Sequence, residues 1–358
     1  MRIGIVGGGQ LGLMLGEAAR ELGMHCTFVD PGDSPPARPI GEHIRAPFDD
    51  QAALQALASK SDVITYEFEN VPVDALAALD DPTPLYPPPL ALQTAQDRLH
   101  EKDQFVALDI PVADYRTIDC LADLEAAAAA LSLPLVLKTR RFGYDGKGQF
   151  VVRTPADIPV AWNELGSQPL IAEAWVPFDY EVSIIGARNT NGDIVTWPLS
   201  RNVHREGILR VAEASDGHGD LHSRASAYVH RLLSHLDYVG VLTLELFVAG
   251  DQLLANEFAP RVHNSGHWTI EGSETSQFTN HVLAITGRPL ESTTTISYPG
   301  MVNLIGEIPE AARSLDDSRL YLHDYGKAPR EGRKLGHITC VAQSEQDREE
   351  LLSRLDEM

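Results

Sequence analysis

Apolar and polar positions alternate in blocks through the N-terminal part of the chain. Short apolar runs typical of buried strands are separated by glycine-rich turns and by segments with helical spacing. This pattern predicts strands at residues 2–6, 25–30 and 62–69, and helices at residues 11–22 and from residue 72. Strands that alternate with helices favour a parallel, doubly wound sheet, so an α/β fold is expected.

The pattern changes after the proline-rich connector at residues 81–90. A helix is predicted at residues 93–108, and paired β-runs dominate from residue 135, with further helices near 155–165 and 219–236. The expected parts, in chain order, are an N-terminal domain at 1–97, a lid at 98–180, a core at 181–290 and a small β-rich C-terminal domain at 291–358.

Composition narrows the class of protein. The 358 residues are 43% hydrophobic and 22% charged, which is typical of a globular protein with more than one domain. A net charge of −22 argues against broad binding to nucleic acid or to an anionic membrane surface. No apolar run approaches the length of about 18 residues needed for a membrane span. Three scattered cysteines and the absence of a signal-peptide pattern predict a reduced, cytoplasmic location.

Two glycine-rich segments are candidate phosphate sites. The run LVLKTRRFGYDGKGQFVV at residues 135–152 places glycines and basic residues between two strands, which predicts a hairpin that closes over phosphates. An ordinary basic turn is the alternative. The run GGGQLG at residues 7–12 matches the dinucleotide fingerprint, and Asp30 ends the next strand. A helix N-terminus there suits NAD or a sugar phosphate, although a purely structural turn would give the same pattern.

Acidic and basic residues gather in the second half of the chain. Glu245 and Glu257 face each other in a predicted hairpin, and with Asn256 they offer oxygen ligands suited to Mg²⁺, unless they lie on a solvated edge. The segment APRVHNSGHWT follows, and Arg261 within it suits a carboxylate, bicarbonate or phosphate. A basic run at residues 327–334 indicates a phosphate pocket or a solvated charged face.

These motifs together resemble the ATP-grasp enzymes. GYDGKGQ, the two glutamates, PRVHNSGHW and GGGQLG are most similar to the bacterial N5-carboxyaminoimidazole ribonucleotide synthase family of purine biosynthesis, over essentially the whole chain. The resemblance implies a Rossmann-like pre-grasp domain, a mobile α+β lid, an α+β nucleotide-binding core and a small C-terminal domain, usually in a homodimer. It also implies that the glycine fingerprint at residues 7–12 belongs to the site of the ribonucleotide and does not bind NAD.

The resemblance also implies a role for individual residues. For ATP it implies Arg98, Lys138, Gly143, Tyr144, Asp145, Gly146, Lys147, Gly148, Gln149, Glu173, Ala174, Trp175, Val176, Glu181, His204, Asn256 and Glu257. For two Mg²⁺ ions it implies Glu245 and Glu257. For 5-aminoimidazole ribonucleotide or bicarbonate it implies Gly9, Gln10, Leu11, Glu67, Tyr144, Asp145, Arg261, His263, Asn264, Lys327, Arg333 and Lys334. The residues assigned to catalysis are Arg261, His263 and Lys334.

The implied reaction is an ATP- and bicarbonate-dependent carboxylation of the ribonucleotide amine through carboxyphosphate, with small molecules as the only partners besides a second copy of the chain. Another ATP-grasp ligase, a formate-dependent ribonucleotide transformylase and a nicotinamide-dependent oxidoreductase are the alternatives. The family tends to read K-E-x-R-P-G-R-K where this chain reads KAPREGRK at residues 327–334. The division of phosphate contacts among these basic residues is therefore left open.

Overall fold

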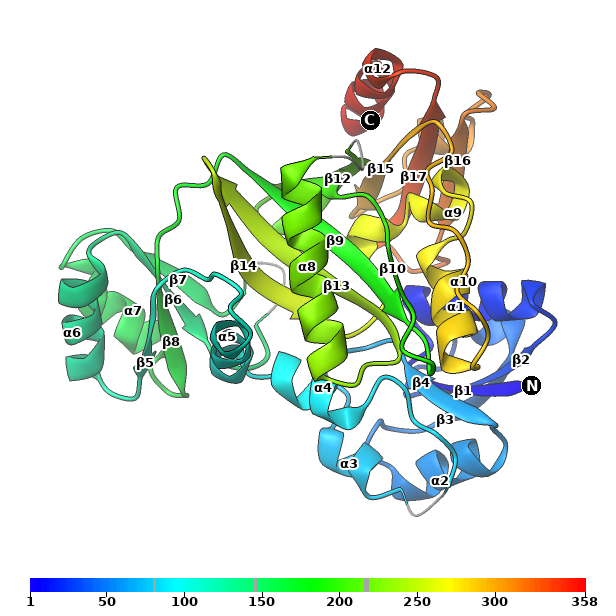
Figure 1. Ribbon diagram of the computed structural model, residues 1–358, viewed down its shortest axis with the longest axis horizontal. Coiled ribbons are helices and arrows are strands. Elements are labelled where there is room, and N and C mark those ends of the chain that lie inside the picture. The colour runs from blue at the N-terminus through cyan, green and yellow to red at the C-terminus, as the bar shows by residue number, and fades with distance from the viewer. Residues whose placement is uncertain (80–81, 144–146, 216–218) are drawn as a thin grey trace.

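A computed structural model describes residues 1–79, 82–143, 147–215 and 219–358. The described residues form three sheets (Figure 1). The N-terminal sheet, drawn in blue, lies beside the large central sheet, and a smaller sheet, which we name the lid sheet, projects from the opposite side. The C-terminal strands lie above the N-terminal sheet and extend the central sheet.

The N-terminal sheet is parallel, with strand order β3-β2-β1-β4, as the alternating pattern predicts. Its strands are β1 (Arg2–Val6), β2 (His25–Asp30), β3 (Glu42–Arg45) and β4 (Val63–Tyr66). Its helical segments are α1 (Gln10–Glu21), η1 (Arg38–Ile40), α2 (Gln51–Ser59) and α3 (Val73–Ala77). Ile3 and Ile5 pack toward α1, whereas Val6 and Ile64 pack toward α2, so helices cover both faces of the sheet.

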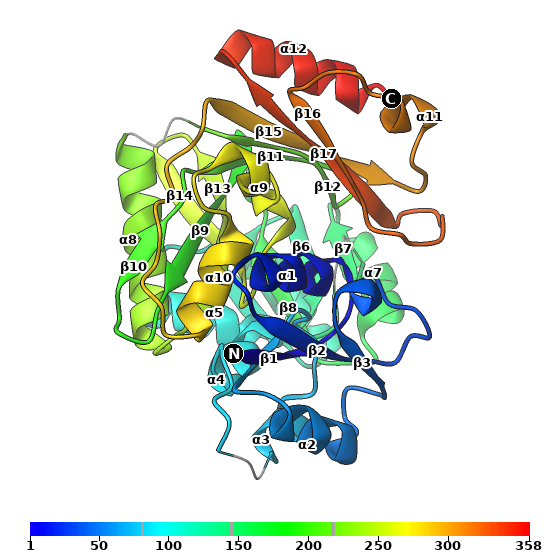
Figure 2. The same ribbon diagram turned by 90° about the vertical axis from the view of Figure 1, so that its right-hand side faces the viewer.

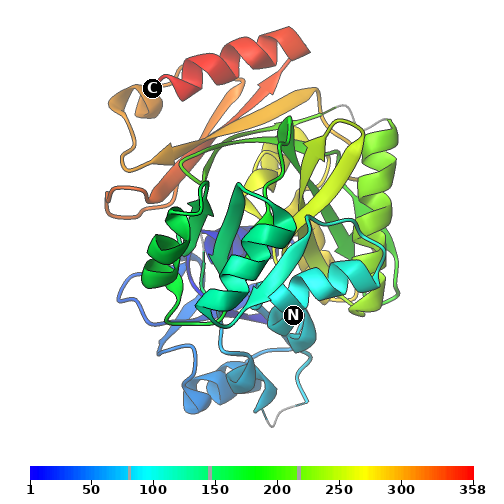
Figure 3. The same cartoon turned by 90° about the vertical axis from the view of Figure 1, so that its left-hand side faces the viewer.

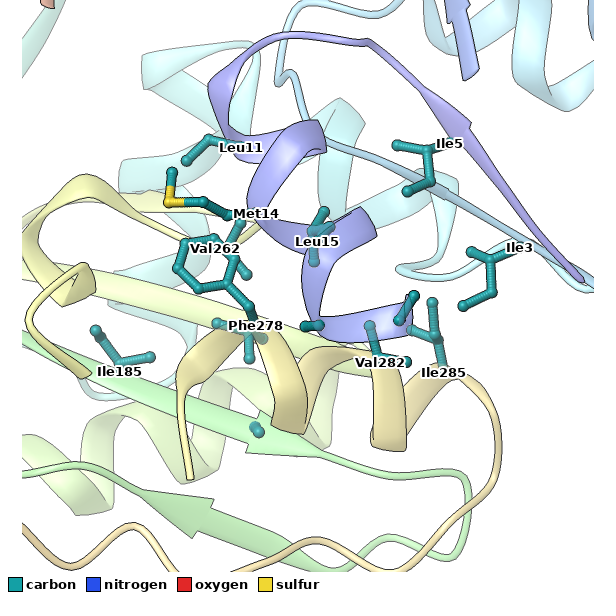
Figure 4. Packing of buried hydrophobic residues seen from close by; sticks show 14 of the residues in the cluster. Ile3, Ile5, Leu11, Met14, Leu15, Ile185, Val262, Phe278, Val282 and Ile285 are labelled. Atoms are coloured by element: carbon teal, nitrogen blue, oxygen red, sulfur yellow. The ribbon is translucent and has the colours of Figure 1, made fainter. Parts of the chain in front are cut away.

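Helix α1 also fixes the N-terminal domain to the core. It lies against α10 (Gln277–Ile285), as Figure 2 shows. Met14 and Leu15 of α1 belong to the same buried cluster as Phe278 and Val282 of α10 (Figure 4). Burial of apolar side chains at a shared face contributes roughly 1.5–3 kcal/mol per large side chain. The two domains therefore share one hydrophobic core.

The prediction of a single helix at residues 93–108 is wrong, because two helices occupy this region. They are α4 (Pro89–Ala95) and α5 (Arg98–Ala107). Asp97 has extended backbone between them, and its carboxylate accepts a hydrogen bond from Leu99 N at 3.0 Å, which caps α5. Arg140 also donates two hydrogen bonds to the Asp97 carboxylate, at 2.9 and 2.7 Å. This distant ion pair holds the break in place.

The lid sheet, which faces the viewer in Figure 3, is antiparallel, with strand order β5-β8-β6-β7. Its strands are β5 (Tyr115–Ile118), β6 (Leu135–Thr139), β7 (Gln149–Val152) and β8 (Leu170–Ala174). Helices α6 (Leu121–Leu131) and α7 (Asp157–Leu165) pack on it and close a hydrophobic core of its own. The β6–β7 pair confirms the strand-to-strand hairpin predicted around the glycine-rich loop.

The large sheet has nine strands among the described residues, in the order β14-β13-β9-β11-β12-β15-β17-β16, with β10 paired to β9. Its strands are β9 (Tyr180–Arg188), β10 (Ile194–Thr196), β11 (Ser200–Arg205), β12 (Ile208–Ala214), β13 (Gly240–Ala249), β14 (Gln252–Ala259), β15 (Tyr298–Ile305), β16 (Leu320–Asp324) and β17 (Lys334–Ala342). The remaining helical segments are α8 (Asp220–His235), η2 (Asn264–Gly266), α9 (Thr269–Gly272), α11 (Glu310–Arg313) and α12 (Glu345–Asp356). None of the described helices has the length and apolar character needed to cross a membrane.

The core and the C-terminal strands share this sheet without interruption. β12 pairs with β15 through Val211 opposite Val302, and β15 pairs in turn with β17. Backbone hydrogen bonds therefore join the C-terminal strands directly to the core.

His281 joins the N-terminal sheet to the large sheet and makes stability depend on pH. Its buried ring accepts a hydrogen bond from Val241 N at Nδ1, at 3.1 Å, and donates from Nε2 to the Thr65 hydroxyl, at 2.9 Å. Burial lowers the pKa of His281 to about 3, from 6.5. Between these two pH values, His281 binds a proton in the unfolded chain but not in the folded chain. Stability is therefore lost as pH falls from 6.5 toward 3.

We expect acidification to cost about 2–3 kcal/mol of folding free energy at about pH 4.5 through this histidine alone. Urea denaturation of the wild type and of His281→Asn measures this loss, because asparagine has no titrating ring. The stability advantage of the wild type over the variant should shrink by that amount between about pH 7.5 and pH 4.5. An advantage that is the same at both values would contradict the assignment.

Candidate active site

A cleft of about 490 Å³ lies where the lid sheet, the large sheet and the N-terminal domain meet. It brings together seventeen of the residues selected from the sequence: Gln10, Leu11, Arg98, Lys138, Gly143, Lys147, Gln149, Trp175, Glu181, His204, Glu245, Asn256, Glu257, Arg261, His263, Asn264 and Lys334. Other selected residues lie outside its lining: Gly9, Glu67, Gly148, Glu173, Ala174, Val176, Lys327 and Arg333. Tyr144, Asp145 and Gly146 lie outside the described residues.

The two glutamates of the β13–β14 hairpin lie directly opposite each other. Glu245 pairs with Glu257 in the ladder, within one residue of the register that the turn predicts, because a bulge follows Glu245. Arg98 contacts Glu257 at 2.6 Å, and His263 Nε2 lies 3.1 Å from a Glu245 oxygen. Burial alone would raise the pKa of Glu245, but His263, His204 and Lys334 together lower it. The Glu245 carboxylate is therefore charged, and both carboxylates line the cleft beside basic groups.

These carboxylates form a donor set that fits Mg²⁺. The side-chain oxygen of Asn256, next to Glu257, is buried and has no hydrogen-bond partner among the described residues. Three neighbouring oxygen-bearing side chains match the preference of Mg²⁺ for hard ligands. Within the described ranges no cluster of three or more His, Cys, Asp or Glu side chains forms a complete metal site. Water and the phosphates of a nucleotide would therefore supply the remaining ligands.

An aromatic and apolar wall lies beside the carboxylates. Phe178 and Phe247 stack with ring centroids 4.7 Å apart and an interplanar angle of 12°, and both line the cleft. Trp175, which is 41% exposed, also faces it. Glu181 contacts His204 Nδ1 at 2.5 Å, and this contact raises the pKa of His204 although burial opposes it. The wall suits a flat base, and the Glu181 carboxylate suits the hydroxyls of a ribose.

Arg261 and His263 lie close to the carboxylate pair, at the start of the segment that follows β14. Arg261 forms an ion pair with Glu69 and donates to the Val262 carbonyl at 2.9 Å. His263 is held on both sides, because its Nδ1 lies 2.9 Å from the Ser265 hydroxyl while Nε2 faces Glu245. An arginine fork and an oriented imidazole beside a charged cleft are suited to holding a small oxyanion and a proton.

An internal carboxylate fills the N-terminus of helix α1. Glu67 accepts hydrogen bonds from Gly9 N at 2.8 Å and from Gly12 N at 2.9 Å. A Cβ on Gly9 would lie 2.6 Å from a Glu67 oxygen, so glycine is required there. Asp30 accepts from Gly8 N at 3.0 Å instead of facing the cleft. The pyrophosphate position that the glycine fingerprint offers to a dinucleotide is therefore occupied by the protein itself.

Two ionisable residues near the site, Glu101 and Lys102, escaped the sequence reasoning. They share one face of α5 with Arg98, and both are buried, Lys102 being only 1% exposed. Glu101 accepts a hydrogen bond from Phe258 N at 2.7 Å, beside Glu257. Their spacing of three and four residues indicates a common face, but charged faces are usually solvated. Only the folded structure shows that this one packs on β14.

Family models match three consecutive parts of the chain. The Ribonucleotide synthetase preATP-grasp domain matches residues 1–96, the ATP-grasp domain matches residues 103–278, and the Phosphoribosylaminoimidazole carboxylase C-terminal domain matches residues 300–351. In chain order, these matches cover the N-terminal domain, then the lid sheet with strands β9 to β14 of the large sheet, and then the C-terminal strands.

Full-length relatives agree with the family models. The chain is 49% identical over 358 residues to an N5-carboxyaminoimidazole ribonucleotide synthase from Pseudomonas aeruginosa, covering 100% of this chain and 98% of the relative. It resembles the solved N5-carboxyaminoimidazole ribonucleotide synthetase of Thermus thermophilus, with a TM-score of 0.94, 47% identity and coverage of 99% and 98% of the two chains. The Aspergillus clavatus enzyme, solved with ADP and 5-aminoimidazole ribonucleotide, gives a TM-score of 0.92 at 30% identity, covering 99% and 98%. The chain therefore belongs to the N5-carboxyaminoimidazole ribonucleotide synthase family of ATP-grasp enzymes.

Proposed function

We propose that this protein carboxylates the exocyclic amine of 5-aminoimidazole ribonucleotide with ATP and bicarbonate, and so forms N5-carboxyaminoimidazole ribonucleotide, ADP and phosphate in de novo purine biosynthesis. One observation carries the proposal: the carboxylate pair, the lid lysines Lys138 and Lys147, and the Arg261–His263 pair all line one cleft. The relative solved with ADP and 5-aminoimidazole ribonucleotide supports the same two ligands for this chain.

ATP would lie between the lid sheet and the large sheet. The aromatic wall would hold the adenine, with the backbone of residues 174–176 reading its edge, and Glu181 would bind the ribose hydroxyls. Lys138 and Lys147 reach the cleft from the β6–β7 hairpin and would bind the phosphates. Glu245 and Glu257, with Asn256, would hold two Mg²⁺ ions, which neutralise phosphate charge when bound.

Bicarbonate would bind to the Arg261 fork near the end of the triphosphate. An oxygen of bicarbonate attacks the γ-phosphorus, which gives carboxyphosphate and ADP, and Arg261 and Lys334 stabilise the negative charge that develops. Carboxyphosphate then breaks into CO₂ and phosphate. The amine of the ribonucleotide attacks CO₂, and His263 takes the proton that the amine loses. Closure of the glycine-rich hairpin would keep water from the short-lived intermediate.

The ribonucleotide would bind where the N-terminal domain and the C-terminal strands border the cleft. Lys327 forms a hydrogen bond with the Gln10 side chain, which brings the basic run at 327–334 against the start of α1. Burial lowers the pKa of Lys327 to about 8, so its ammonium is still charged at neutral pH. With Arg333 and Lys334 it would hold the ribonucleotide phosphate. The homodimer and the cytoplasmic location stay predictions.

Leaving out one component at a time from a coupled ADP-release assay tests the proposal. We expect turnover to require Mg²⁺, ATP, bicarbonate and 5-aminoimidazole ribonucleotide together, with mass-spectrometric detection of the carboxylated product. Replacing bicarbonate by formate, or the ribonucleotide by an amino acid, is the matched control and should abolish turnover. Turnover that follows formate instead of bicarbonate would replace the carboxylation by formyl transfer.

A further inference from the structure

Lys102 is a fully buried cation that does not line the cleft. It lies on α5 with 1% of its surface exposed, and its ammonium donates to the carbonyl oxygens of Ala255 at 3.3 Å and Asn256 at 2.9 Å. The same ammonium lies 3.3 Å from Oε2 of Glu173, at the end of lid strand β8. One side chain therefore joins three elements: helix α5, the carboxylate-bearing strand β14 and the lid sheet.

Glu173 shares one oxygen between two lysines. Lys138 Nζ lies 3.1 Å from Oε2 of Glu173, the atom that Lys102 also contacts. The other oxygen, Oε1, is buried and has no hydrogen-bond partner in the described part of the chain. Of the three charged groups, Lys138 alone is a lining residue of the cleft. A nucleotide phosphate must therefore compete with Glu173 for the Lys138 ammonium.

The charges of this trio are set by mutual contact in a buried region. Burial alone would raise the pKa of Glu173, but Lys102, Lys138 and Arg98 lower it to about 2, so it is an anion at neutral pH. Burial lowers the pKa of Lys138, and Glu173 opposes that shift. Without Lys102, a larger share of the Glu173 charge would fall on Lys138, the other lysine in contact with its carboxylate.

We propose that Lys102 is a positioning residue for nucleotide binding, which takes up part of the Glu173 charge so that the Lys138 ammonium stays available to the nucleotide phosphates. The inference rests on the proposed function only in placing those phosphates at Lys138. Lys102 does not touch the nucleotide; it acts through Glu173. The hydrogen bonds from Lys102 to Ala255 and Asn256 fix the distance between this charge and the carboxylate strand.

Calorimetric titration of ADP into purified variants tests the inference. Lys102→Met should weaken ADP binding by about tenfold or more, because Lys138 is then neutralised by Glu173. The double variant Lys102→Met/Glu173→Gln removes the buried charges as a pair and should restore ADP affinity to within about threefold of the wild type. A purely structural role for Lys102 predicts no such rescue.

Arg348→Met is the matched control for loss of a buried cation. Arg348 is 5% exposed on α12, where it donates to the Ala214 carbonyl and lies 3.2 Å from Glu213, away from the cleft. The Arg348→Met substitution should lower the melting temperature and leave ADP affinity unchanged. If Lys102→Met does not fold, the double variant still decides, since its buried charges are removed together.

Two results would overturn the inference: wild-type ADP affinity in folded Lys102→Met, or a double variant that binds ADP as weakly as the single one. Rescue in the double variant supports it. The measurement needs neither bicarbonate nor ribonucleotide. A wild-type protein that binds ADP but forms no carboxylated product would therefore refute the proposed function and leave the role of Lys102 standing.

Discussion

Glu257→Gln is expected to lower ADP release at saturating substrates by at least about a hundredfold, the cost typical of removing one group that stabilises transition-state charge. The amide keeps the size of the side chain but loses the charge that faces Glu245 and contacts Arg98 at 2.6 Å. Because a neutral amide is a weaker ligand for Mg²⁺, the Mg²⁺ concentration at half-maximal rate should also rise. Steady-state ADP release measured over a Mg²⁺ titration gives both values.

Glu101→Gln is the matched control for this prediction. Glu101 is 2% exposed and accepts from Phe258 N beside Glu257. Burial and the repulsion from Glu257 raise the pKa of Glu101 to about 8, so it is mostly protonated at neutral pH and glutamine matches its charge and shape. We expect this variant to keep its rate within about threefold of the wild type. Equal rates in both variants would contradict the assignment of Glu257 as a ligand of Mg²⁺.

Arg261→Ala should abolish carboxylation, with a loss of about 10²–10³ in rate, while ADP affinity stays nearly unchanged. The proposed function assigns bicarbonate to the arginine fork and the nucleotide to other residues of the cleft. Product formation followed by mass spectrometry gives the rate, and calorimetric titration gives the affinity. A variant that carboxylates at the wild-type rate would contradict the assignment.

The ion pair with Glu69 requires a second variant, because removing Arg261 leaves that carboxylate without its cation. Arg261→Ala/Glu69→Gln removes both charges. If Arg261 binds bicarbonate, the double variant should be as inactive as the single one. Recovery of carboxylation in the double variant would mean that Arg261 serves only to neutralise Glu69.

Local pattern was sufficient for the hairpin that carries the carboxylates. Side chains alternate along a strand with a period of two, and the turn at Gly250 and Asp251 sets which residues pair. These two rules place Glu245 within one residue of Glu257, and a β-bulge between Glu245 and Leu246 shifts the pairing from Asn256 to Glu257. The parallel N-terminal sheet and the β6–β7 hairpin followed from equally local signals.

Long-range ion pairs decided what local pattern did not. The helical pattern at residues 93–108 continues through Asp97, but Asp97 caps α5 and also forms an ion pair with Arg140, more than forty positions away. Likewise, the Glu67 carboxylate, which directly follows β4, accepts hydrogen bonds from the N-terminus of α1. The fingerprint at residues 7–12 by itself cannot show which anion binds there. Nor does spacing show that the charged face of α5 is buried.

The unbroken sheet from β14 to β16 makes the two sides of the cleft mechanically unequal. Glu245 on β13 and Lys334 on β17 belong to one hydrogen-bonded frame, so a change in their separation would break backbone ladders. Among the described strands, those of the lid sheet pair only with one another. Strand ladders therefore fix the side of the cleft that carries Glu245 and Lys334, whereas the described strands of the lid sheet, which carry Lys138, form no ladder with that frame.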